Sequence, residues 1–237
     1  MNAIYGTNRI FYEDTRWFLW KLCVLFITIP LALFWFLMGL FVDLKANDVP
    51  TIIWGPVYYY VCHYAAVGFR SVLPIAIGLG STRKQSITSF IFIGLAGVAV
   101  SLFIINGVEY LLVYLDRKDI LSIDVFHIAG FVYTDYQFFN FFLIDLALAF
   151  FLFGFSLLLS SIHYLIGFMK MIISVSIISI LIIIPYYFGM LDPLLKWVME
   201  LKPFAVFTMI GGIGILSTFI SCLLMLNAPL EKKASRF

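Results

Sequence analysis

The sequence predicts an all-α integral membrane protein with six transmembrane helices. Apolar residues make up 63% of the 237 residues, charged residues make up 12%, and the mean hydropathy is +1.07. Soluble domains are about 45–50% apolar and about 25% charged, so this composition excludes a soluble protein. The longest segment between the predicted spans is about 114–137, which is too short for a soluble domain. We therefore expect one transmembrane domain over residues 1–237.

The six spans are apolar stretches of sufficient length. A helix needs ~20 mostly apolar residues to cross ~30 Å of hydrocarbon. No cleavage site of the A-x-A type follows the first stretch, so we expect that stretch to be retained as a span. The predicted spans are residues 20–42, 51–73, 87–113, 138–160, 171–189 and 204–226.

Two shorter segments have the pattern of helices lying along the membrane surface. Residues 8–20 place Ile10, Phe11 and Trp17 at helical spacing, which predicts an interfacial helix before the first span. Between spans five and six, Asp192 is a suitable N-cap and Pro193 fits the first helical position. We expect a short amphipathic helix there, on the outer face; an ordinary connector dipping into the headgroups is the alternative.

The charged residues predict the orientation. Six spans put both termini on one side, and that side carries nine basic residues against three acidic ones. The opposite side carries five basic residues against nine acidic ones. Because short loops rich in Lys and Arg stay in the cytoplasm, we expect both termini to be cytoplasmic. A multi-pass protein of a plasma membrane, in a bacterium, is the expected setting.

Several kinds of chemistry are disfavoured by what the chain lacks. The net charge of +2 gives no reason to expect a nucleic-acid partner. The sequence contains no phosphate-binding loop and no H-E-x-x-H motif, and its three cysteines and three histidines have no metal-ligand spacing. Asp116 and Asp119 form a D-x-x-D pattern followed by Asp124, but Arg117 and Lys118 share that loop, which favours a solvated charged loop. We expect no metal and no cofactor on this chain.

Polar residues inside spans are costly and therefore informative. Tyr59, His63 and Arg70 lie along one face of span two, and Asp145 and Ser156 share a face of span four with Ser160 and His163. These residues are candidates for a polar pathway through the membrane, although a polar clasp between helices explains them equally well. Opposite charges in adjacent spans also make a pairing of Arg70 with Asp145 worth testing.

Small residues recur at helical spacing in two other spans. Span three has Gly94, Gly97 and Ser101, and span six has Gly214, Ser217 and Ser221. Such stripes allow helix backbones to approach closely, so they predict packing faces, within the chain or in a dimer.

The segment between spans two and three is the most distinctive. In Arg70-Ser-Val-Leu-Pro74-Ile-Ala-Ile-Gly78-Leu-Gly80-Ser-Thr-Arg83-Lys84-Gln85, we expect Pro74 to interrupt the helix and the glycines to turn the chain. This segment resembles the loop between the second and third spans of ABC-2 type transporter permeases. The six spans, the cytoplasmic termini, the interfacial helix and the short outer helix agree with that resemblance.

The resemblance implies a transport subunit that is not itself an enzyme. It implies a dimer with a second permease copy or a paralogue, a separate ABC ATPase subunit that binds ATP and Mg²⁺, and export of a cargo. The aromatic interior favours an amphipathic or hydrophobic cargo such as a peptide, an antibiotic or a lipid. The resemblance places the ATPase-coupling interface at Pro74, Gly78, Gly80, Thr82, Arg83 and Lys84.

Two other classes of function remain open from the sequence. One is a membrane-embedded enzyme acting on lipid or prenyl substrates through Asp116, Asp119, Asp124 or Asp145 with His127. The other is a non-transporting immunity or assembly protein that binds a toxin or a scaffold. A neighbouring gene for an ATPase would favour the transporter over both.

Overall fold

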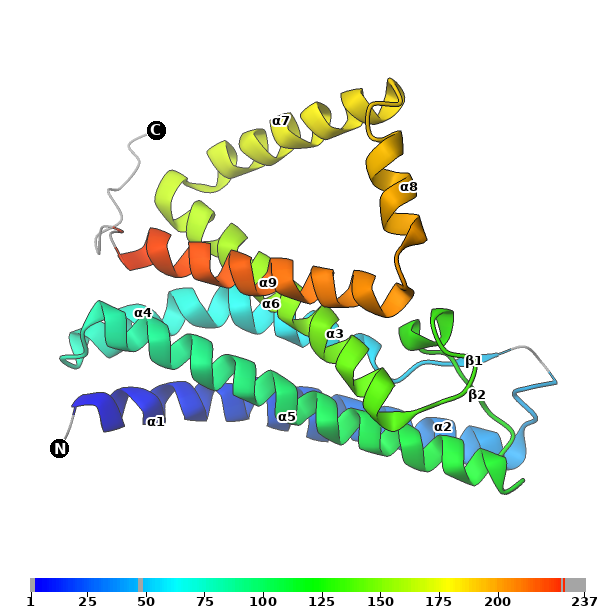
Figure 1. Cartoon of the computed structure of the whole chain (residues 1–237). Coiled ribbons are helices and arrows are strands. Elements are labelled where there is room, and N and C mark those ends of the chain that lie inside the picture. The colour runs from blue at the N-terminus through cyan, green and yellow to red at the C-terminus, as the bar shows by residue number, and fades with distance from the viewer. Residues whose placement is uncertain (1–2, 47–48, 227, 229–237) are drawn as a thin grey trace.

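Long antiparallel helices dominate the computed structural model, which describes residues 3–46, 49–226 and 228 (Figure 1). Five helices are long and apolar enough to cross a membrane, and a bent pair would make a sixth span. The five are Tyr5–Phe41, Arg83–Arg117, Phe138–Ile166, Phe168–Tyr187 and Pro203–Leu226, and the bent pair is Gly55–Gly68 with Arg70–Gly78. The chain is therefore a multi-pass membrane protein, and each predicted span overlaps one of these elements.

The first span begins earlier than expected. Helix α1 (Ala3–Thr15) continues through the π-helical segment η1 (Arg16–Thr28) into α2 (Ile29–Phe41). Residues 8–20 thus continue into the first span without a break in the helix. The reason is a second, buried face: Thr7, Phe11 and Thr15 recur every four residues, and the Phe11 ring packs on Phe90 of α5 with centroids 5.6 Å apart.

The second span bends before Pro74 rather than ending there. It comprises α3 (Gly55–His63), the π-helical turn η2 (Tyr64–Gly68) and α4 (Phe69–Gly78), with a 40° bend between Gly68 and Arg70. A proline ring clashes with the carbonyl four residues earlier, here that of Arg70, so the distortion lies upstream of the proline. Helix α4 continues to Gly78, and Gly80 turns the chain with a φ of +92°.

Helices α5 (Arg83–Arg117), α6 (Phe138–Ile166) and α9 (Pro203–Leu226) form the centre of the bundle, and α6 and α9 cross in Figure 1. The predicted packing faces are confirmed within the chain. A Cβ on Gly94 would lie 2.9 Å from Tyr64, one on Gly97 would meet Thr15, and Gly154 lies directly against the backbone of Gly214. Gly154 and Gly214 thus let the backbones of α6 and α9 touch, whereas Gly94 and Gly97 make room for side chains of neighbouring helices.

We predict that Gly214→Ala destabilises the protein by about 1–3 kcal/mol, because the new methyl group would meet the backbone of Phe150 and Phe151. Gly212→Ala is the matched control on the same helix, since a Cβ there meets nothing within 4 Å. Thermal unfolding of the two variants in mild detergent checks this. Equal melting temperatures would mean that α6 and α9 do not approach closely.

Helices α7 (Phe168–Tyr187) and α8 (Asp192–Glu200) form an arch that leaves the bundle after α6 and returns to α9 (Figure 1). None of the residues of α7 or α8 is buried. The predicted short helix between spans five and six is confirmed, with Leu191 rather than Asp192 at the N-cap and the proline in the first turn.

The two ends of the bundle differ in charge and in structure. At one end, which we call the basic end, α4 ends and α5 begins with Arg83 and Lys84 (Figure 1). At the opposite end, which we call the acidic end, strand β1 (Pro50–Thr51) pairs in parallel with β2 (Asp124–Val125), and the 3-10 helix η3 (Ile128–Phe131) follows. The strand pair joins the two loops that close the acidic end.

Candidate functional site

A buried group of ionisable side chains lies near the acidic end. Glu109 of α5 and Asp145 of α6 are 0% exposed, and His127, which precedes η3, is 3% exposed. The Nε2 atom of His127 lies 3.2 Å from Oδ2 of Asp145 and 3.5 Å from Oε2 of Glu109. We call these three residues the acid–histidine cluster.

The strand pair positions His127. Val125 pairs with Thr51, the N–H of Phe126 donates to the carbonyl of Thr51 at 3.1 Å, and Nε1 of Trp54 donates to the carbonyl of Phe126 at 3.0 Å. The loop is thus held against the start of α3. The next residue, His127, then lies inside the bundle, with its ring 4.8 Å from that of Phe141.

Asp145 accepts three hydrogen bonds from three different segments. Tyr58 of α3 donates to Oδ1 at 2.7 Å, whereas Asn106 of α5 and His127 bond to Oδ2 at 2.7 and 3.2 Å. Three convergent donors stabilise the ionised form of a carboxyl group. Asp145 therefore connects α3, α5, α6 and the loop before η3 through one carboxyl group.

The tautomer of His127 follows from its second nitrogen. The backbone N–H of Ala129 donates to Nδ1 at 2.9 Å, so Nδ1 carries no proton and the proton of the neutral ring is on Nε2, facing Asp145. Burial alone lowers the pKa of His127, but the hydrogen bond and the negative charge of Asp145 outweigh burial and raise this pKa above its ordinary value.

Glu109 has a different environment. Neither of its side-chain oxygens has a hydrogen-bond partner among the described residues. Nε2 of His127 approaches Oε2 of Glu109 to 3.5 Å. The side-chain oxygen of Asn106, one turn earlier on α5, also lacks such a partner in the described part of the chain. Glu109 is therefore a buried carboxyl group without the donors that an ionised carboxylate needs.

A polar cavity of about 290 Å³ at the acidic end reaches His127. Tyr136 also lines it and donates from its hydroxyl to the carbonyl of Asn106 at 3.1 Å. Burial raises the pKa of Tyr136 above its ordinary value. The charged residues that line the cavity are Lys45, Asp116, Arg117, Asp124 and Asp135.

The predicted pathway residues divide between two places. Tyr59, His63, Arg70 and Ser156 all line a second cavity of about 430 Å³, between the bent second span and the adjacent ends of α6 and α7. Asp145 lies instead in the acid–histidine cluster, so Arg70 and Asp145 do not pair. Nη1 of Arg70 lies 2.6 Å from Nδ1 of His163, and Ser160 donates to the carbonyl of Ala66, which makes this cavity wall a polar clasp as well.

The predicted coupling residues form a turn at the basic end, residues 74–84, which we call the elbow. Thr82 and Gln85 make reciprocal capping hydrogen bonds of 3.3 and 3.2 Å that start α5. Pro74, Gly78, Gly80, Thr82 and Lys84 are exposed. Arg83 is half-buried, because Nη1 donates to the carbonyls of Leu226 and Ala228 at the end of α9.

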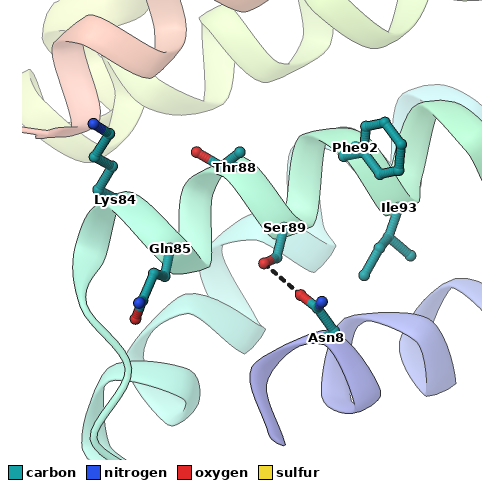
Figure 2. A pocket seen from close by; sticks show the side chains of 7 residues that line it. All are labelled: Asn8, Lys84, Gln85, Thr88, Ser89, Phe92 and Ile93. Atoms are coloured by element: carbon teal, nitrogen blue, oxygen red, sulfur yellow. Dashed lines mark hydrogen bonds between the residues drawn. The ribbon is translucent and has the colours of Figure 1, made fainter. Parts of the chain in front are cut away.

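A third cavity, of about 370 Å³, adjoins the elbow (Figure 2). Its walls come from the start of α1 and the first turns of α5, where Ser89 donates to Asn8 at 2.6 Å. Lys84 and Gln85 line the same cavity beside Thr88 and Phe92, as Figure 2 shows.

The aspartates of the D-x-x-D pattern do not join the cluster. Asp116 pairs with Lys45 at 2.7 Å and accepts from the N–H of Ile123, whereas Asp119 is exposed in a turn with a φ of 55°. Among the residues that the structure describes, no group of three His, Cys, Asp or Glu side chains has an arrangement that could hold a metal ion.

The sequence interpretation missed Glu109, Asn106 and Tyr58 as site residues. Glu109 is one of the nine acidic residues on the expected outer side, although it lies within the predicted span 87–113. Glu109 lies three residues after Asn106, so both side chains lie on one helical face within the span. This spacing was the sequence signal for a polar site there. No protein-family model matches this chain, and neither a curated protein nor a solved structure does.

Proposed function

We propose that this chain is the permease subunit of an ATP-driven ABC exporter of the ABC-2 type. It works as a dimer with a second copy or a paralogue and is driven by separate ATPase subunits. The observation that carries the proposal is the elbow, which exposes an apolar tip at the basic end while its base is fixed to two spans. The basic end faces the cytoplasm, because short segments rich in Lys and Arg stay there.

The tip of the elbow is suited to a protein partner. Leu79 is 69% exposed, and the neighbouring Pro74, Gly78 and Gly80 are exposed as well. Exposed apolar groups in a short, turned segment with a basic neighbour, Lys84, are a reasonable docking surface for a cytoplasmic subunit.

The base of the elbow would transmit movement. The capping hydrogen bonds of Thr82 and Gln85 fix the elbow to α5, which continues without a break for 35 residues to the acidic end. Arg83 joins the same base to the end of α9. A push on the tip would therefore move α5 and α9 together, which supports a rocking mechanism between inward-open and outward-open states.

The cargo pathway would involve the cavity lined by Tyr59, His63, Arg70 and Ser156. Its lining is largely apolar with a few polar groups, which suits an amphipathic or hydrophobic cargo. We expect the second permease copy to cover part of α7, since all of the residues of this helix are at least partly exposed and most are large and apolar. Lipid would cover the rest.

The decisive experiment tests the tip of the elbow with a matched pair of variants. We predict that Leu79→Asp abolishes both copurification of the ATPase subunit from the native host and stimulation of its ATP hydrolysis by the permease, because a charge replaces the exposed apolar contact. Met169→Asp is the control: Met169 is 73% exposed and lies in the first turn of α7. It should leave both readouts unchanged.

Two results would contradict the proposal. Purification of the wild-type chain without an ATPase under several mild detergents would remove the transporter as the preferred function. An effect of Leu79→Asp no larger than that of Met169→Asp would remove the elbow tip from the docking surface.

A further inference from the structure

We propose that the acid–histidine cluster is a proton-binding site, in which Glu109 holds a proton that exchanges through His127 with water at the acidic end. The site differs from the elbow and from the Arg70 cavity. It does not depend on the proposed function, because it rests on the geometry of the cluster alone.

The two carboxyl groups of the cluster have contrasting surroundings. Asp145 accepts hydrogen bonds from Tyr58, Asn106 and His127, so its surroundings suit a negative charge. Glu109 is equally buried, yet no described group donates a hydrogen bond to it. Leaving a carboxylate ionised and unpaired in an apolar interior costs several kcal/mol, on the order of the ion's effective desolvation penalty, so such a group takes up a proton.

The imidazole of His127 faces both carboxyl groups. Nε2 has one proton and lies within 3.5 Å of both Asp145 and Glu109. If both carboxyl groups were ionised, two negative charges would share that single N–H. Protonation of Glu109 removes this conflict and gives the cluster one negative charge, on Asp145.

Within the described part of the chain, no Lys or Arg side chain is in contact with the cluster. Tyr58, Asn106 and Tyr136 are the other polar groups there, and Lys45 and Arg117 line the cavity beyond His127. Lys45 pairs with Asp116, and Arg117 bonds to the carbonyl of Tyr136 at 3.4 Å. The sequence places no charged residue at 22–42, which includes most of η1 and all of α2, and none in α9.

His127 provides the route by which a proton would reach Glu109 from water. His127 lines the polar cavity of about 290 Å³, whereas Glu109 does not. A proton from water would bind Nδ1 of His127 after the hydrogen bond from Ala129 opens, and the proton on Nε2 would pass to Oε2 of Glu109. The ring would then be neutral with its proton on Nδ1. A water molecule in the cavity would give a proton to Nε2 before Nδ1 releases its own proton to water, which restores the starting tautomer. The net change is the transfer of one proton from water to Glu109.

Infrared spectroscopy of the full chain in lipid nanodiscs tests the proposal. The carbonyl stretch of a protonated carboxyl group is separate from the bands of ionised carboxylates. We expect such a band at neutral pH, its complete loss in Glu109→Gln, and its retention in Glu200→Gln. Glu200 is the matched control because it is exposed on α8.

Isotope labelling makes the test independent of any variant's folding. Labelling the side-chain carboxyl carbon of glutamate with ¹³C should shift the band of the wild-type protein, and labelling aspartate should not. The absence of a band at neutral pH, or a shift on aspartate labelling alone, would overturn the proposal. A band that moves with glutamate labelling but survives in Glu109→Gln would also overturn it.

Discussion

Asp145→Ala is expected to destabilise the protein by about 3 kcal/mol or more. The substitution leaves the hydroxyl of Tyr58, the side-chain amide of Asn106 and Nε2 of His127 without their acceptor, and all three residues are buried. Each buried donor left unsatisfied costs about 1–3 kcal/mol. Chemical unfolding in mild detergent measures the loss.

Two further variants make this prediction specific. Asp135→Ala removes an exposed carboxylate that lines the adjoining cavity, and it should change the stability by less than about 0.5 kcal/mol. Glu109→Gln keeps the shape of a side chain that accepts no hydrogen bond from a described residue, so it should be far less harmful than Asp145→Ala. Equal stability of Asp145→Ala and Asp135→Ala would show that Asp145 does not hold the segments together.

The spans were predictable from the sequence because the bilayer sets their length. The stretches expected at 138–160 and 204–226 correspond to Phe138–Ile166 and Pro203–Leu226. The start of the first span was not predictable in this way. Burial of Phe11 against Phe90 is a tertiary contact, and the same residues also fit an interfacial pattern.

The acid–histidine cluster shows why the site was harder to predict than the fold. Its members come from α5, from the loop before η3 and from α6, and the β1–β2 pairing is what brings His127 inward. The sequence marks Asp145 as costly within a span but cannot show which distant groups it meets. By contrast, the helical face shared by Tyr59, His63 and Arg70 correctly indicated a common cavity, because those residues belong to one span.

Arg83→Glu is the second variant with a large expected effect, and it would act within the chain. The wild-type guanidinium donates to the carbonyls of Leu226 and Ala228, at the negative end of the α9 dipole. A glutamate there replaces attraction with repulsion and removes a charge-assisted interaction of about 1.5–3 kcal/mol. We expect amide hydrogen exchange over residues 222–226 to become about 10–100 times faster, and ATPase stimulation by the permease to be lost.

Lys84→Glu separates the local charge from this link. Lys84 is exposed beside Arg83, and its replacement by glutamate reverses a charge in the same way. No hydrogen bond joins Lys84 to α9 among the described contacts. It should leave exchange at the end of α9 unchanged. If Arg83→Glu abolished stimulation while exchange over 222–226 stayed at the wild-type rate, Arg83 would act by contacting the ATPase directly. Faster exchange together with lost stimulation would instead mean that the elbow works through α9, so that docking at Leu79 and transmission through Arg83 are separate steps.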